Sequence, residues 1–166
     1  KRLFTRTVWM LGRNSKRWAM LLDFSHGSAN FATETPPVGF LLNADVHFYP
    51  GAAALRARIG VTHGEPEPFT TMPFGSIDTA LQQFTDALAA DPWLRSWPAV
   101  ISSVVPSFVD GSWFVVDESG TALRAEGDSD LLWKLLGISG GYPVTVCGTW
   151  NALALTPISV FTGFFS

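Results

Sequence analysis

The clearest pattern of polar and apolar positions lies in residues 43–58. It begins as a strand with one apolar and one polar face, the alternation expected of a half-buried sheet. The pattern breaks at Pro50 and Gly51 and resumes with Arg56 and Arg58 two positions apart. Side chains two positions apart share a strand face, so both arginines are expected to face the same way. We predict strands near residues 40–49 and 55–62.

Strand-forming stretches also occupy both ends of the chain. Residues 7–11 and 18–24 flank a polar loop, which predicts an N-terminal hairpin. The polar stretch from 25 to 37 contains two prolines and is predicted to be a surface loop. The remaining predicted strands are residues 99–105, 113–116, 122–124, 142–150 and 153–161.

Two stretches have the helical period instead. After Ser76, a good N-cap residue, one apolar stripe recurs at spacings of four and three until Asp91 and Pro92 end it. A shorter helix is predicted over residues 129–136, with Gly137 capping its C-terminus. The elements together predict an α+β fold: an antiparallel β-sheet or half-open barrel with two helices packed on it. The stripe of the first helix is Ile77, Leu81, Phe84 and Leu88.

The composition is that of a folded domain. The 166 residues are 47% hydrophobic and 15% charged, a balance that excludes a disordered chain. We expect a single domain over residues 1–166, with residues 66–73 as the candidate internal seam. Because the chain starts at Lys1, we interpret it as a piece of a longer protein. Five tryptophans are expected to fill its core: Trp93, Trp97, Trp113, Trp133 and Trp150.

The single cysteine, Cys147, excludes an internal disulfide framework and a zinc site built from cysteines of this chain alone. One buried thiol is typical of a reducing compartment, so we predict a cytoplasmic location. Every long apolar run is broken by charge, glycine or proline well short of a membrane span. We therefore expect no membrane partner.

Basic residues are concentrated at the start of the chain. Six of the eleven Lys and Arg residues precede Asp23, the first acidic residue. A basic start on an acidic body could attract nucleic acid or an acidic partner. Because these residues are spaced among apolar ones, the expected interpretation is that they line the solvent face of the first hairpin.

Residues 137–141 match the Gly-x-Ser-x-Gly pattern of hydrolase nucleophiles, with Ser139 at its centre. That chemistry requires a strand before the serine and a helix after it. Here the predicted order is reversed, and all three histidines precede the motif. We therefore interpret Ser139 as part of a glycine-rich turn from helix to strand.

Asp45, His47 and Tyr49 alternate along one predicted strand, so their side chains should emerge on one face. Asp23 and His26 end another strand and could lie nearby. Carboxylates and imidazoles suit a metal ion, which makes a metal-assisted hydrolase the enzyme alternative. The ordinary interpretation is the polar outer face of a half-buried sheet.

Arg56 and Arg58 allow two interpretations. The ordinary one is a cross-strand ion pair with Asp45 or Glu65. The sharper one is an anion-binding patch for a phosphate or an acidic peptide, which the forked guanidinium group suits.

Several phrases spread over nearly the whole chain resemble the region outside the zinc motif in bacterial SWIM zinc-finger proteins. They are WAMLLDF at 18–24, ADVHFYPGA at 44–52 with Leu55 and Arg56, AADPW at 89–93, LLGISGG at 135–141, PVTV at 143–146, Trp150 and LTP at 155–157. The zinc motif of that family is Cys-x-Cys followed by Cys-x-His. Cys147 has neither a cysteine partner nor a later histidine, so no residue here inherits zinc binding.

The resemblance implies an auxiliary domain of a larger intracellular protein, an adaptor associated with MoxR-type AAA+ ATPases and von Willebrand A-domain proteins. We therefore expect a non-catalytic interaction module without catalytic residues or cofactors. Its partner would be a protein, and nucleic acid bound through the basic hairpin or the parent protein is the alternative. The candidate interaction surface is Asp45, His47, Tyr49, Arg56 and Arg58.

Overall fold

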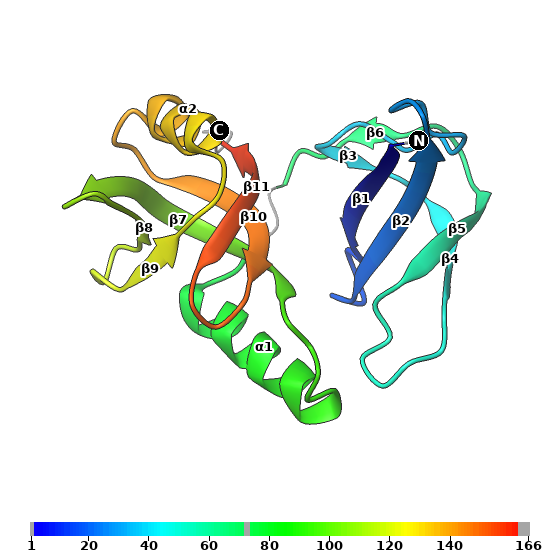
Figure 1. Ribbon diagram of the computed structural model, residues 1–166, viewed down its shortest axis with the longest axis horizontal. Helices are drawn as coiled ribbons and strands as arrows, with labels where there is room; N and C mark the ends of the chain where they lie inside the picture. Colours follow the sequence, from blue (N-terminus) through cyan, green and yellow to red (C-terminus); the bar gives the residue numbers. More distant parts are fainter. Residues whose placement is uncertain (1, 72–73, 163–166) are drawn as a thin grey trace. The chain divides into compact units, whose positions relative to one another are not determined.

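The computed structural model describes residues 2–71 and 74–162 (Figure 1). The fold is α+β, with two helices and mainly antiparallel strands, as predicted. The chain divides into two compact units, Lys1–Phe69 and Thr70–Ser166, called unit 1 and unit 2 below. The division falls inside the 66–73 stretch that the sequence marks as the candidate seam.

Unit 1 is built from pairs of strands. The predicted N-terminal hairpin is confirmed and is longer than expected: β1 (Leu3–Leu11) and β2 (Trp18–His26) pair antiparallel along their whole length. Two further antiparallel pairs follow. They are β3 (Phe40–Leu41) with β6 (Glu67–Pro68), and β4 (Ala44–Phe48) with β5 (Ala57–Thr62).

The two longer hairpins of unit 1 meet at one point. Met20 of β2 forms an isolated parallel bridge with Arg56, and the Met20 N–H donates to the Leu55 carbonyl over 2.8 Å. The buried apolar residues of unit 1 gather around this junction: Trp18, Ala19, Leu21 and Ala57.

Unit 2 is a closed five-stranded barrel with two helices. Its strands follow one another around the barrel in the order β10-β11-β9-β8-β7. The elements are α1 (Ile77–Ala90), β7 (Trp97–Val109), β8 (Ser112–Val116), β9 (Ala122–Ala125), α2 (Ser129–Ser139), β10 (Val144–Trp150) and β11 (Leu155–Phe161).

The connectivity of the barrel is a Greek key. Strands β7, β8 and β9 follow as neighbours, and β10 returns after α2 to lie beside β7. A parallel bridge between Leu155 of β11 and Ala125 of β9 closes the barrel. Five-stranded Greek-key barrels include the OB-fold, and a fold class alone assigns no function.

Strand β7 holds the barrel together because it is long enough to pair on both sides. Its first half pairs with β10 and its second half with β8. The register shifts between Val144 and Val146, opposite a β7 segment in which Ser103 has φ 55°. Such a bulge bends a strand and strengthens its twist. The bend lets β7 serve both neighbours, so the half-open alternative gives way to a closed barrel.

Helix α1 forms as the sequence predicts. The Ser76 hydroxyl oxygen accepts a hydrogen bond from the Thr79 N–H over 3.0 Å, and the helix ends at Asp91. The buried side of this helix packs against the barrel. The core of unit 2 includes Ile77, Phe84, Ile101, Val104, Val115, Val146, Trp150 and Leu155.

Helix α2 is longer than predicted. Gly137 was expected to cap it, but the helix continues to Ser139 and Gly140 is the cap, with φ 55°. Leu132, Leu135 and Ser139 form one buried face. The packing of this face stabilises the last helical turn, although Gly137 has a low helix propensity. The Asp128 carboxylate caps the N-terminus by accepting from the N–H groups of Asp130 and Leu131.

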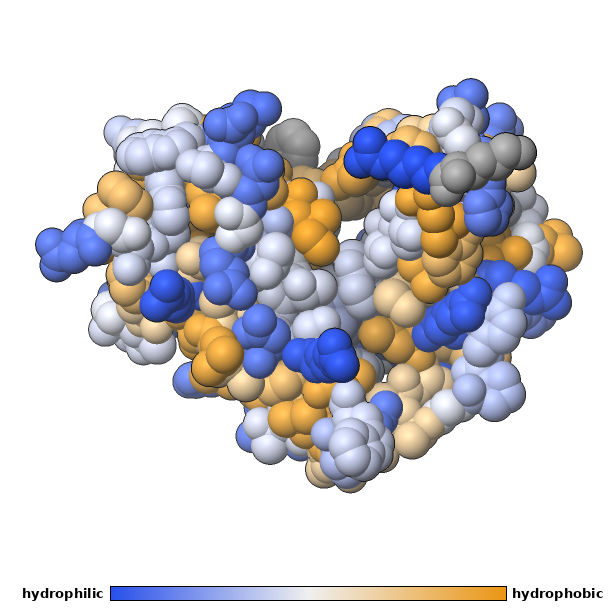
Figure 2. All heavy atoms as spheres, viewed as in Figure 1, coloured by the Kyte–Doolittle hydropathy of each residue, from blue (hydrophilic) through white to orange (hydrophobic). Residues whose placement is uncertain are grey.

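The expectation that all five tryptophans fill the core is wrong for two of them. Trp150 is buried and Trp97 and Trp113 are half-buried, but Trp93 is 90% exposed and Trp133 is 51% exposed. Trp93 lies in the turn that follows α1, and Trp133 lies on the outer face of α2. Figure 2 shows hydrophobic residues among hydrophilic ones on the surface of both units.

Within the described part of the chain, neither helix is long and apolar enough to cross a membrane.

Candidate functional site

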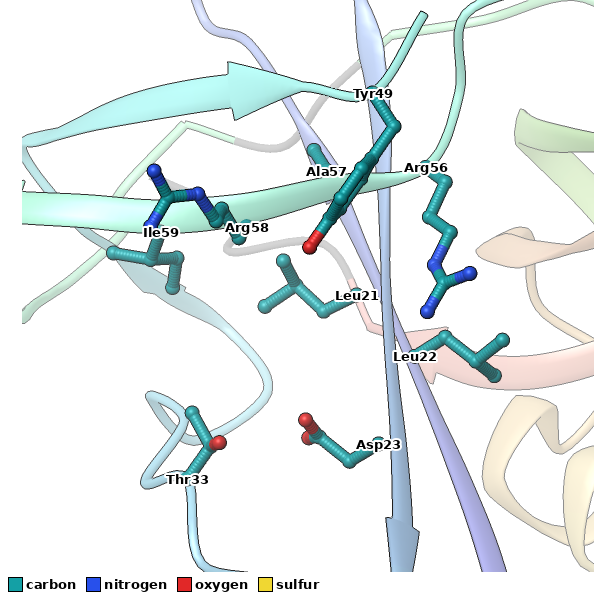
Figure 3. A pocket seen from close by; sticks show the side chains of 9 residues that line it. All are labelled: Leu21, Leu22, Asp23, Thr33, Tyr49, Arg56, Ala57, Arg58 and Ile59. Atoms are coloured by element: carbon teal, nitrogen blue, oxygen red, sulfur yellow. The ribbon is translucent and has the colours of Figure 1, made fainter.

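Three of the five candidate interaction residues line one cavity in unit 1. The cavity has a volume of about 220 Å³ and lies where the β1–β2 and β4–β5 hairpins meet (Figure 3). The candidates that line it are Tyr49, Arg56 and Arg58. The other lining residues are Leu21, Leu22 and Asp23 of β2, Thr33 of the following loop, and Ala57 and Ile59 of β5.

The lining has an apolar floor and a polar rim. Leu21 is buried at the junction of the hairpins. In Figure 3 the Tyr49 hydroxyl and the Asp23 carboxylate are both directed towards the space beside it. The cavity therefore offers an apolar surface with hydrogen-bonding groups around it.

The carboxylate of Asp23 already has a cationic partner. Arg6 lies directly opposite it in the hairpin, and the Arg6 Nη2 and Nε atoms donate to Asp23 Oδ2 over 2.6 and 3.2 Å. Arg6 Nη2 also donates to the Thr33 carbonyl over 2.6 Å, and the guanidinium carbon lies 4.7 Å from the Phe31 ring centroid. This one side chain neutralises Asp23 and holds the loop of residues 27–39 at the edge of the cavity.

The two arginines of the rim have no such partner. Arg56 and Arg58 are exposed, and neither takes part in an ion pair within the described residues. The Arg56 guanidinium carbon lies 5.1 Å from the Tyr49 ring centroid, a cation–π contact. The Tyr49 N–H donates to the Arg56 carbonyl over 2.9 Å, so backbone and side chain both hold this pair together.

The expected ion pair between these arginines and Asp45 or Glu65 is wrong. Asp45 Oδ1 instead lies 3.2 Å from His63 Nε2, and both side chains are about half exposed. The cause is a β-bulge: Ala44 faces Thr62 but Val46 faces Ile59. The bulge shifts the register at Asp45, a change that strand alternation cannot anticipate.

His47 also lies apart from Asp45. It faces Arg58 in the ladder, and its ring lies over Gly60, where an added Cβ atom would come within 2.6 Å of His47 Nε2. The single polar face predicted for Asp45, His47 and Tyr49 is therefore divided: Tyr49 lines the cavity, and the other two do not.

The proposed metal cluster is not assembled. Asp23 is held by Arg6, Asp45 by His63, and His26 ends β2 opposite Leu3. Across residues 2–71 and 74–162, no three His, Cys, Asp or Glu side chains are grouped so that they could hold a metal ion.

Ser139 is a structural residue in this fold. It is buried in the last turn of α2, and its hydroxyl donates to the Tyr142 carbonyl over 2.6 Å. This is the helix-to-strand turn that the sequence predicts. Cys147 lies in barrel strand β10, where burial raises the pKa of its thiol to about 12.

Sequence reasoning missed Arg6 and Thr33 as parts of the site. The signal for Arg6 was available, because Arg6 and Asp23 are equally distant from the middle of the first hairpin loop. Opposite charges at such positions face each other in a hairpin and form a cross-strand pair. Thr33 had no signal, since its place depends on the path of the loop.

Comparison with protein-family models, curated proteins and solved structures finds no match for this chain. The resemblance to SWIM zinc-finger proteins therefore stays a prediction.

Proposed function

We propose that this chain is a non-catalytic interaction module, and that unit 1 binds an acidic segment of a partner protein through Arg56, Arg58 and Tyr49. The observation that carries the proposal is the pair of exposed arginines without an ion-pair partner, on the rim of an apolar cavity. Arginine binds carboxylates through its forked donors, and within residues 2–71 and 74–162 neither guanidinium group is in an ion pair.

The charge of unit 1 supports an acidic partner. Residues 1–69 contain eight Lys and Arg against five Asp and Glu, whereas residues 70–166 contain three against nine. Because Arg6 neutralises Asp23, the cavity rim is positive as well. An acidic segment would thus be attracted to unit 1 and repelled by unit 2.

The size and shape of the site support a peptide segment. At about 220 Å³ the cavity is smaller than the roughly 300–1,000 Å³ of pockets that enclose small-molecule ligands. In Figure 3 the two guanidinium groups lie on either side of Tyr49 and do not converge on one point. An extended segment with two acidic side chains around an apolar one matches this arrangement better than a single small anion.

The family resemblance extends this proposal to a biological setting. In that setting the partner is an AAA+ ATPase of the MoxR type or a von Willebrand A-domain protein, and the chain works in the cytoplasm as part of a SWIM-type adaptor. Capture of the parent protein from its own cells, followed by identification of an ATPase among the captured proteins, tests this wider part.

The charge-reversal variant Arg56→Glu with Arg58→Glu tests the site itself. The probe is a fluorescein-labelled acidic peptide, acetyl-Glu-Gly-Leu-Gly-Glu-amide, whose Glu and Leu side chains share one face when it is extended. The neutral control is acetyl-Gln-Gly-Leu-Gly-Gln-amide, the Gln-Leu peptide. We expect at least a tenfold loss of affinity, since the change replaces two attractive charges with two repulsive ones. The Gln-Leu peptide should bind weakly to both proteins.

The matched control is Arg13→Glu with Lys16→Glu, which makes the same change in net charge within the exposed hairpin loop. It should retain at least half of the wild-type affinity. Equal losses in the two double variants would mean that overall charge, and not the cavity, attracts the peptide, and would contradict the proposal.

Nucleic acid is the second candidate because unit 1 is basic. A labelled single-stranded oligonucleotide in place of the peptide tests it, with salt as the variable. Binding that falls steeply with added salt and is lost equally in both charge-reversal variants would favour nucleic acid.

A further inference from the structure

Unit 2 has a partly exposed aromatic cluster outside its buried core. Phe108, Trp113 and Trp133 contact one another with ring centroids 4.8, 4.8 and 5.2 Å apart. The rings come from β7, β8 and α2, so three separate elements fix their positions. Phe108 remains 45% exposed and Trp133 51% exposed.

The position of the cluster explains its exposure. Phe108 and Trp113 face each other in the β7–β8 ladder at its outer end, next to the Asp110-Gly111 turn. Trp133 reaches them from the outer face of α2, beside the buried Leu132 and Leu135. Half of this aromatic surface packs on the barrel, and the other half faces solvent.

Such a surface has the properties of a binding site. Tryptophan is enriched among the residues that dominate binding energy, and aromatic groups held rigidly lose little entropy when a partner binds. Neighbouring Val109 is also largely exposed and extends the apolar surface along the hairpin.

The charges around the cluster indicate which partner fits. Asp110 lies in the turn that joins the two paired strands, and Asp130 lies one turn before Trp133 on the same side of α2. Both are exposed. Glu126 and Asp128 add two further acidic residues before α2, against two basic ones, Lys134 next to Trp133 and Arg124 opposite Phe114 in the β8–β9 ladder. The surroundings are therefore acidic.

We propose that the cluster of Phe108, Trp113 and Trp133 binds an arginine-containing segment of a partner protein. A guanidinium group can lie flat on an indole ring and pair with a carboxylate at its edge, which matches an exposed tryptophan flanked by Asp110 and Asp130. Unit 1 uses the same contact internally: the Arg17 guanidinium carbon lies 3.4 Å from the Phe48 ring centroid. A nucleic acid is disfavoured here, because its phosphates would face the acidic flanks.

This surface is independent of the cavity in unit 1 and selects the opposite charge. The two proposals therefore fail separately: the acidic peptide reports on Arg56 and Arg58, and a basic peptide reports on the aromatic cluster. The probe for the cluster is fluorescein-labelled acetyl-(Gly-Arg)₄-amide, and the specificity control is acetyl-(Gly-Lys)₄-amide.

The decisive variant is Trp133→Ala, with Trp93→Ala as its matched control. Both tryptophans belong to unit 2 and both are exposed, but Trp93 lies in the turn after α1 and makes no ring contact with the cluster. We expect Trp133→Ala to weaken binding of the arginine peptide at least tenfold, as for removal of a dominant interface residue, and Trp93→Ala to change it less than twofold.

Asp110→Asn with Asp130→Asn keeps the rings and removes the flanking charge. We expect this double variant to weaken binding about three- to tenfold. We also expect the lysine peptide to bind the wild type more weakly than the arginine peptide does.

Three outcomes would overturn the proposal: equal effects of Trp133→Ala and Trp93→Ala, equal affinity for the two peptides, or no binding of the arginine peptide at low salt. Circular dichroism of each variant shows whether the fold is retained, and the Asn variant keeps the test valid if Trp133→Ala unfolds.

Discussion

The two units of the chain differ in how they bury apolar surface. Of the twenty-two buried hydrophobic residues in the described chain, eighteen lie in unit 2 and four in unit 1. Unit 2 closes its strands into a barrel, while unit 1 consists of two-stranded pairs joined at the Met20–Arg56 bridge. Closure removes the free edges of a sheet, and isolated two-stranded pairs are marginally stable. The comparison teaches that unit 2 supplies a rigid core and unit 1 an open, adaptable surface.

The two units also differ in the charged and aromatic side chains at their surfaces. In unit 1, arginines lie against aromatic rings: Arg2 near Phe4, Arg6 near Phe31, Arg17 near Phe48 and Arg56 near Tyr49. In unit 2, Phe108, Trp113 and Trp133 contact one another, and most charged residues near them in sequence are acidic. The same chain thus presents a basic surface on one unit and an acidic, aromatic one on the other.

The largest expected effect concerns the reactivity of Cys147, whose side chain is half-buried in barrel strand β10. Burial raises the pKa of its thiol from 9.0 to about 12, and only the thiolate reacts with alkylating agents. At pH 8 we expect iodoacetamide to react about a thousandfold more slowly with the native protein than with the urea-unfolded protein, as follows from the two thiolate fractions. The native rate should rise with pH throughout the range in which the barrel stays folded.

A thiol in unit 1 gives the matched comparison. Ser28→Cys places a second cysteine in the exposed loop after β2, where it should react at the rate of an ordinary thiol. Mass spectrometry over time should show one fast and one slow addition. Two fast additions would mean that unit 2 opens readily, which would reverse the contrast between the units.

Removal of core volume from the barrel is the next largest effect. Leu155 is fully buried and closes the barrel through its bridge to Ala125, whereas Leu153 is 79% exposed. Leu155→Ala should lower the free energy of unfolding by about 3 kcal/mol, as for other buried leucines. Leu153→Ala, the control, should change it by less than about 0.5 kcal/mol. Urea titrations of the two variants measure the difference, and similar values would argue against a closed barrel.

Alanine substitutions at two glycines compare how well each unit tolerates an added Cβ atom. A Cβ atom at Gly148 would clash with the backbone of Thr156 on the neighbouring barrel strand, which cannot move without breaking the ladder. At Gly60 it would meet the end of the exposed His47 ring, which can swing away. Gly148→Ala should cost about 2–3 kcal/mol, in the range of overpacked cores, and Gly60→Ala less than about 1 kcal/mol. Thermal unfolding of both variants tests the order, and an equal cost would show that unit 1 is as tightly packed as unit 2.

Local signals explain how much of this fold could be predicted from the sequence. Helix α1 was predicted almost to the residue because Ser76 caps its start, Asp91 and Pro92 end it, and the stripe between them is regular. The first hairpin was predicted for the same reason, from two strand patterns around one polar loop. Each of these elements depends on residues close together in the chain.

The features that sequence reasoning missed depend on distant residues or on irregular backbone. Barrel closure joins Ala125 to Leu155 across α2 and β10, and nothing in either strand specifies that parallel bridge. The bulge at Asp45 turned an expected arginine pair into a contact with His63. At the candidate site, alternation correctly grouped Arg56 with Arg58, but the cavity beside them exists only because the two hairpins meet at Met20.

The smallest effect tests whether Arg6 organises the surface of unit 1. Arg6→Ala removes both hydrogen bonds to Asp23 and the one to Thr33. Because both side chains are partly exposed to water, we expect a loss of only about 1 kcal/mol, below the range for fully buried charged hydrogen bonds. The loss should be local, so amide hydrogen exchange should accelerate in the 27–39 loop and not in the barrel. Arg13→Ala, in the exposed hairpin loop, is the control and should leave the exchange unchanged.

Arg6→Lys keeps the positive charge but loses the forked guanidinium group. It should restore only part of the protection, because one ammonium group cannot serve both acceptors in the same geometry. Full protection in Arg6→Ala would show that the loop is held by other contacts, and the arginine would then have no part in shaping the cavity.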